Sequence, residues 1–85
     1  MIFREIHRSD RAAWEPLWAG YLEFYKHNLA PELTELTWNR FFDDSVRLHG
    51  FVAELDGEVV GFAHCWFNHT TWLDKADLYL EDLFV

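Results

Sequence analysis

The dipeptide Asp56-Gly57 separates two β-type runs, Phe51–Leu55 and Glu58–Asn68. Asp-Gly is a favoured pair for the two-residue turn of a β-hairpin, because both positions of that turn need a positive φ. The sequence therefore predicts an antiparallel hairpin over residues 51–68, and any fold of this chain must accommodate it.

The second run of the hairpin has one face of small residues and one face of large residues. Alternation along a strand gives the two sets Gly61, Ala63, Cys65 and Val60, Phe62, His64, Trp66. A row of small residues predicts that a helix or a ligand lies close against that face.

A strand and a helix are predicted before the hairpin. Ile2–Ile6 is typical of a strand, and Ser9-Asp10 is an N-cap signal for a helix. Apolar residues then recur at helical spacing, at Ala13, Leu17, Tyr21 and Phe24. Because Pro16 lies inside this pattern, the helix is either kinked there or begins near Glu15 with the proline in its first turn.

The remaining elements complete an α+β pattern. We expect a loop at residues 28–33, which include Pro31, and a second helix from the cap Thr37 to about Ser45. Residues 48–50 are expected to break the pattern, and Leu78–Val85 reads as the last strand. The predicted order is β-α-α-β-β-β, with a mostly antiparallel sheet.

Composition limits the function classes. The 85 residues give room for one small domain, and a hydrophobic content of 51% excludes a disordered chain. A formal charge of −8 argues against nucleic-acid and anionic-membrane partners. The single cysteine, Cys65, excludes an intrachain disulfide, and the histidines have no metal-ligand spacing, so no metal is expected. The charged N-terminus does not resemble a signal peptide, which predicts a cytoplasmic protein.

Two adjacent acids, Glu81 and Asp82, lie in the otherwise apolar last strand. Alternation places Glu81 on the face of Tyr79 and Leu83, and Asp82 on the opposite face. A strand that is apolar on both faces is normally buried, and a desolvated carboxylate is suited to take a proton from an amine. The alternative is a half-exposed strand with its acids in water.

Other side chains are open to two interpretations. His64 is either a base or a satisfied core histidine, and Cys65, on the opposite face, is expected to be a small core residue. Trp72, in a loop, either stacks on a substrate or covers the core. The aromatic residues of the first helix are too many for one face, so some should meet a cleft or a partner: Trp14, Trp18, Tyr21, Phe24 and Tyr25.

Two motifs, VVGFAH at residues 59–64 and YLEDLFV at residues 79–85, stand in this order with Trp72 and a following lysine between them. The chain thereby resembles the N-terminal half of the GNAT superfamily of acetyl-CoA-dependent N-acetyltransferases, above all its diamine and polyamine (spermidine/spermine-type) branch. Family members often have an acid shortly before that tryptophan, where this chain has Thr70-Thr71. The resemblance implies the GNAT acyl-CoA N-acyltransferase fold, truncated after the fourth strand, so residues 1–85 are expected to be a single partial domain.

The resemblance also implies an activity, with acetyl-CoA as co-substrate and a small primary amine as acceptor. Glu81 would accept the amine proton, Asp82 would help to bind the cationic amine, and Trp72 would line the acceptor pocket. Tyr25, among the surplus aromatics of the first helix, is a further candidate for substrate contact. The strand backbone would pair with the pantetheine arm at Leu83, Phe84 and Val85.

The family continues after this strand into a glycine-containing loop that cradles the pyrophosphate of acetyl-CoA. The 85 residues alone are therefore expected neither to bind acetyl-CoA tightly nor to turn over. An apolar, unpaired last strand predicts a homodimer or a strand-swapped oligomer. The alternative function is a non-enzymatic α+β interaction or ligand-binding module that adds its last strand to a partner.

Overall fold

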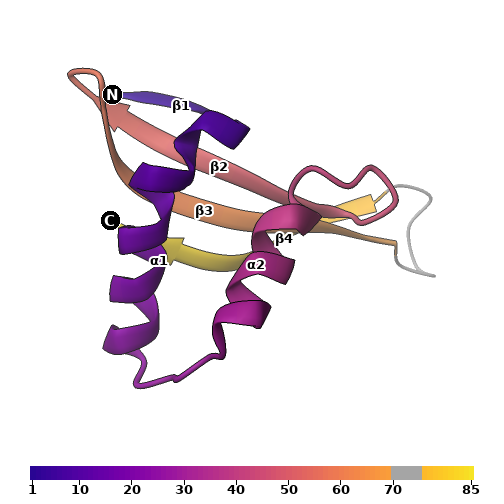
Figure 1. Cartoon of the computed structure of the whole chain (residues 1–85). Helices are drawn as coiled ribbons and strands as arrows, with labels where there is room; N and C mark the ends of the chain where they lie inside the picture. Colours follow the sequence, from indigo (N-terminus) through magenta and orange to yellow (C-terminus); the bar gives the residue numbers. More distant parts are fainter. Residues whose placement is uncertain (70–75) are drawn as a thin grey trace.

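A computed structural model describes the backbone of residues 1–69 and 76–85, and the side chains of residues 1–66 and 80–85. The elements are β1 (Ile2–Glu5), a 3-10 turn (Arg8–Asp10), α1 (Arg11–Phe24), α2 (Pro31–Arg40), β2 (Leu48–Leu55), β3 (Glu58–His69) and β4 (Ala76–Phe84). The strands form one antiparallel sheet in the order β1-β2-β3-β4. Figure 1 shows both helices over one face of the sheet, where their side chains form a common core with β2 and β3. The predicted α+β class and element order are confirmed.

The hairpin has the predicted geometry, with φ of 53° at Asp56 and 81° at Gly57. β2 begins earlier than predicted, because residues 48–50 pair with β3 and do not interrupt the strand. Gly50 serves close packing in this segment. A Cβ atom there would lie 2.7 Å from the side chain of Ile6 and 3.2 Å from that of Phe41. Glycine is therefore required for the approach of these two side chains, and the expected break at residues 48–50 is wrong.

The helix boundaries correct two predictions. α1 begins at Arg11 and continues through Pro16, so the helix does not start at Glu15. α2 runs from Pro31 to Arg40, so the loop expected at residues 28–33 is confirmed only for residues 28–30, and the start expected at Thr37 is wrong. Proline suits the first helical position because its φ is preset and the missing N–H has no partner there in any case.

The core is built on aromatic rings. Trp14 is fully buried and stacks on Trp18 with the ring centroids 5.8 Å apart, while Trp38 of α2 lies 4.9 Å from Trp14. Phe24, the last residue of α1, and Tyr25, which follows it, are 73% and 55% exposed. The aromatic residues of this segment are thus partly buried and partly exposed. This agrees with the prediction that they are too many for one face of the helix.

The small face of β3 is packed against strand backbone. A Cβ atom on Gly61 would lie 2.8 Å from the backbone oxygen of Phe84, at the end of β4. The small residues of β3 predicted a helix or a ligand close to this face. At Gly61 the close neighbour is the end of β4, so that prediction is wrong at this position. In the described part of the chain, no helix is long and apolar enough to cross a membrane.

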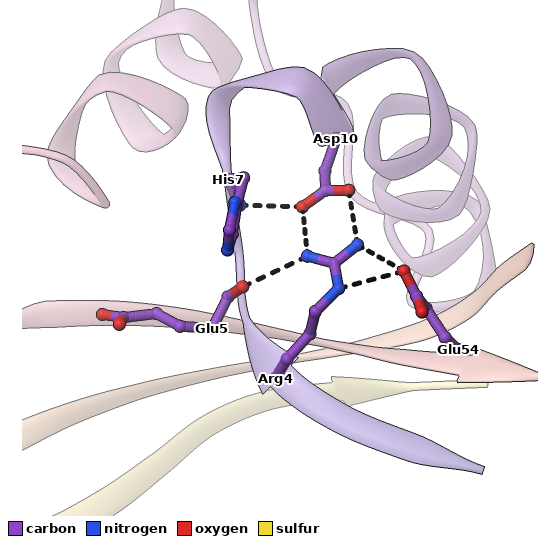
Figure 2. Close-up of polar contacts among 5 residues, drawn as sticks. All are labelled: Arg4, Glu5, His7, Asp10 and Glu54. Atoms are coloured by element: carbon purple, nitrogen blue, oxygen red, sulfur yellow. Dashed lines mark hydrogen bonds and ion pairs between the residues drawn. The ribbon is translucent and has the colours of Figure 1, made fainter. Parts of the chain in front are cut away.

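An ion-pair cluster around Arg4 joins β1 to the start of the helical layer and to β2 (Figure 2). Both terminal nitrogens of Arg4 bond to the carboxylate of Asp10, at 2.8 and 2.9 Å, and Nη2 lies 2.6 Å from Oε1 of Glu54. The carboxylate of Asp10 also accepts a 2.7 Å bond from the backbone N–H of His7. The hydrogen bonds from Arg4 lower the pKa of Asp10 in spite of its burial.

Arg4→Met is expected to lower the free energy of unfolding by about 2–4 kcal/mol, because it leaves the Asp10 carboxylate buried without its counter-ion. Urea denaturation followed by circular dichroism measures this change. Arg40→Met, which removes an exposed arginine, is the matched control and should change the free energy of unfolding by less than about 0.5 kcal/mol. Equal effects of the two substitutions would contradict a stabilising role for the Arg4 cluster.

Candidate active site

A register shift in β4 determines where the two acids lie. His64 pairs with Asp82, but the next residue, Cys65, pairs with Leu80, so Glu81 is an extra residue on β4. Such a β-bulge changes the side on which the following side chains emerge. Glu81 and Asp82 consequently both line one pocket, and the prediction from simple alternation, which placed them on opposite faces, is wrong.

The pocket has a volume of about 420 Å³ and opens between α2, the segment that follows α2, and strands β2 to β4. Its lining combines two acids, two arginines, a histidine and aromatic side chains. The lining residues are Trp18, Thr37, Arg40, Val46, Arg47, Leu48, His64, Trp66, Glu81 and Asp82. Opposite charges thus meet in one small cavity with apolar walls, which is the usual character of a site for a small polar ligand.

His64 lies at the base of this pocket with 1% of its surface exposed. The indole Nε1 of Trp14 is 3.1 Å from Nε2 of the imidazole, and Nδ1 of the imidazole is 2.9 Å from Oδ2 of Asp82. Because an indole N–H only donates, Nε2 must accept, and the proton of a neutral His64 therefore lies on Nδ1 and is donated to Asp82. Burial lowers the pKa of His64, although Asp82 opposes the shift. The interpretation as a satisfied core histidine fits these contacts, since both ring nitrogens are already engaged.

Asp82 is the ionised partner in this group. Its other oxygen, Oδ1, accepts a 2.5 Å hydrogen bond from the hydroxyl of Tyr21 on α1. Burial alone would raise the pKa of Asp82, but the hydrogen bonds from His64 and Tyr21 outweigh it and lower the pKa. Burial and the bond to Asp82 raise the pKa of the Tyr21 phenol, which therefore keeps its proton. Asp82 thus brings a fixed negative charge to the pocket.

Glu81 differs from Asp82 in its exposure. The side chain of Asp82 is 18% exposed, whereas Glu81 is an exposed residue that accepts a 3.1 Å hydrogen bond from the indole N–H of Trp66. The expectation of buried acids therefore holds for Asp82, and the alternative of an acid in water holds for Glu81. A carboxylate in this position can exchange protons with solvent while facing the pocket.

Four other predicted site residues do not line this pocket: Tyr25, Leu83, Phe84 and Val85. Tyr25 packs on Tyr21, with the ring centroids 4.9 Å apart, and does not line the cavity. Phe84 packs its ring against Tyr21 and Phe62, while Leu83 and Val85 are exposed. Trp72 lies outside the described residues.

Cys65 does not line the pocket. Cys65 is buried, and its burial raises the pKa of the thiol, in keeping with a small core residue. Across residues 1–66 and 80–85, no three side chains of the metal-binding types gather around one point.

Three pocket features were not predicted from the sequence. The helical spacing of Tyr21 indicated a core position, but not its bond to Asp82. No pattern in the sequence singles out Arg40, the last residue of α2, or Arg47, in the segment between α2 and β2.

The fold and the pocket define a class of protein. The sequence profile of the acetyltransferase (GNAT) family matches residues 4–85, and the chain belongs to this family. It is similar to the D-amino-acid N-acetyltransferase HPA3 of Saccharomyces cerevisiae, with 36% identity over 88 residues. That match covers 100% of this chain and 54% of the yeast protein. The chain thus spans about half the length of the curated relative that it matches.

Lowering the pH from 7 to 5 is expected to reduce the free energy of unfolding. The pKa of His64 is lowered in the folded state, so below about pH 6.5 the unfolded chain binds more protons and is favoured. Urea denaturation at several pH values measures how the free energy of unfolding changes with pH. His64→Gln should weaken this pH dependence, and the control His27→Gln, at an exposed site, should retain it.

Long-range ¹H–¹⁵N NMR should show a neutral His64 protonated at Nδ1 at pH 6. A charged imidazole at that pH would contradict the assignment.

Proposed function

We propose that the protein carrying this chain transfers the acetyl group of acetyl-CoA to a primary amine of a small molecule. The observation that carries the proposal is the β-bulge of β4, which brings Glu81 and Asp82 to one pocket in a chain of the GNAT family. The name of the yeast relative, which describes an amino-acid N-acetyltransferase, supports amines as acceptors. The binding-module alternative has no comparable support from the relatives.

The two acids have separate roles in this proposal. Asp82 stays ionised between Tyr21 and His64, and its fixed charge attracts the substrate ammonium group. Glu81, which is exposed at the pocket, accepts the ammonium proton, directly or through a water molecule. Loss of that proton frees the nitrogen lone pair. Acetyl-CoA supplies an activated acyl carbon that the amine attacks directly, giving the N-acetyl product and releasing the thiol of CoA.

The end of β4 is the segment that we assign to acetyl-CoA. β4 is an edge strand of the described sheet, so the backbone groups on its side away from β3 have no strand partner within the described residues. The ring of Phe84 is held between Tyr21 and Phe62, with the backbone of Gly20 in close contact. This packing fixes the strand end and supports backbone pairing of the pantetheine arm with residues 83–85.

We further propose that residues 1–85 are the N-terminal half of the family domain, because the match covers 54% of the yeast relative. A cytoplasmic location and a dimer are part of the same proposal. The dimer is supported by Leu80, Leu83 and Val85 of the edge strand, which are 52%, 53% and 82% exposed.

Residues 1–85 alone are expected to bind acetyl-CoA more weakly than about 1 mM, because they contain no glycine-rich loop at a helix N-terminus for the pyrophosphate. Isothermal titration calorimetry measures this affinity. Micromolar binding by the 85-residue chain would contradict the proposed division of the domain.

Glu81→Gln in the complete protein is expected to lower kcat by about 100- to 10,000-fold, because it removes the base but keeps the size of the side chain. The acidic limb of the pH–rate profile should be lost with it. Glu58→Gln, at the exposed hairpin turn, is the matched control and should leave kcat unchanged. An unchanged profile in Glu81→Gln would assign proton removal to another group.

A further inference from the structure

We propose that Arg40 and Arg47 bind a carboxylate on the amine acceptor, so that the substrate is an α-amino acid or a similar zwitterion. This inference rests on the proposed function and assigns substrate selection to the pair of arginines. Both arginines line the same pocket as Glu81 and Asp82. The pocket therefore offers positive groups on the side of α2 and negative groups on β4.

Within the described residues, Arg40 and Arg47 differ from the other three arginines in their contacts. Arg4 and Arg11 each form ion pairs with two acids, and the guanidinium of Arg8 lies 4.5 Å from the ring of Phe42. Among the described residues, the side chains of Arg40 and Arg47 form no such contact with another protein group, although the chain has fifteen acids. Their guanidinium groups are exposed and available to a ligand in the pocket.

The chemistry of these groups selects the ligand. A guanidinium group binds a carboxylate with two parallel hydrogen bonds, as it also binds a phosphate. In the same pocket, Asp82 and Glu81 suit an ammonium group. An α-amino acid carries both charges within a few bonds, and its side chain would lie among apolar groups such as Trp18, Val46 and Leu48.

A polyamine fits this pocket less well. Its charges are all positive, so a chain that reached from Asp82 across the pocket would approach Arg40 and Arg47, and like charges in close proximity disfavour binding. The arginine pair thus favours a zwitterion over the polyamine acceptor that the motifs alone suggest.

The test compares leucine with leucinamide, in both enantiomers, in the complete protein with saturating acetyl-CoA. The two acceptors share the amine and the side chain, and only leucine has the carboxylate. Arg40→Gln and Arg47→Gln are each expected to lower kcat/KM for leucine by about 10- to 100-fold and for leucinamide by less than about threefold. Arg8→Gln, outside the pocket, is the matched control.

The inference would be overturned if the variants lost kcat/KM equally for leucine and leucinamide. It would also be overturned if the KM for acetyl-CoA increased and the KM for leucine did not. Failure of the proposed function is a separate result, in which the wild-type protein acetylates neither acceptor. In that case, NMR titration of the wild type and the two arginine variants with leucine decides the inference. Weaker leucine binding in the variants supports a carboxylate site, and equal binding overturns it.

Discussion

The hydrogen-bonded chain from Trp14 through His64 to Asp82 is the constraint on which the pocket depends. It joins α1, β3 and β4, and its central member is 1% exposed. A buried donor or acceptor without a partner costs about 1–3 kcal/mol, so each member holds the next in one orientation. The tautomer of His64 follows from this chain, and so does the direction in which Asp82 presents its charge to the pocket.

The β-bulge adds a second acid without disturbing that chain. With one extra residue in β4, Asp82 keeps its place opposite His64 while Glu81 reaches the same pocket in an exposed position. The two carboxylates therefore differ in environment: the half-buried one is fixed by two donors, and the exposed one is free to exchange protons. In the proposed function, this difference assigns substrate binding to Asp82 and proton transfer to Glu81. Arg40 and Arg47 also line this pocket, which therefore carries both signs of charge.

Local sequence signals predicted the parts of the structure that depend on neighbours in the chain. The turn at Asp56-Gly57 follows from backbone preferences of two residues, and the order of elements follows from periodicity. The pattern around Pro31 predicts a loop, but proline is equally suited to the first turn of a helix, and α2 begins at this residue. The bulge at Glu81 and the bond between Tyr21 and Asp82 depend on pairing between distant segments, which no local pattern encodes. The two acids of the pocket could thus be named from the sequence, but not its two arginines or the arrangement of the side chains.

The most direct test of the account is mass spectrometry of the products formed when the complete protein is incubated with acetyl-CoA and a mixture of small primary amines. We expect N-acetylated amine together with an equal amount of free CoA, and no product when the amines are left out. Release of CoA without an acetylated amine, or no release with any acceptor, would contradict acetyl transfer to an amine as the function of this pocket.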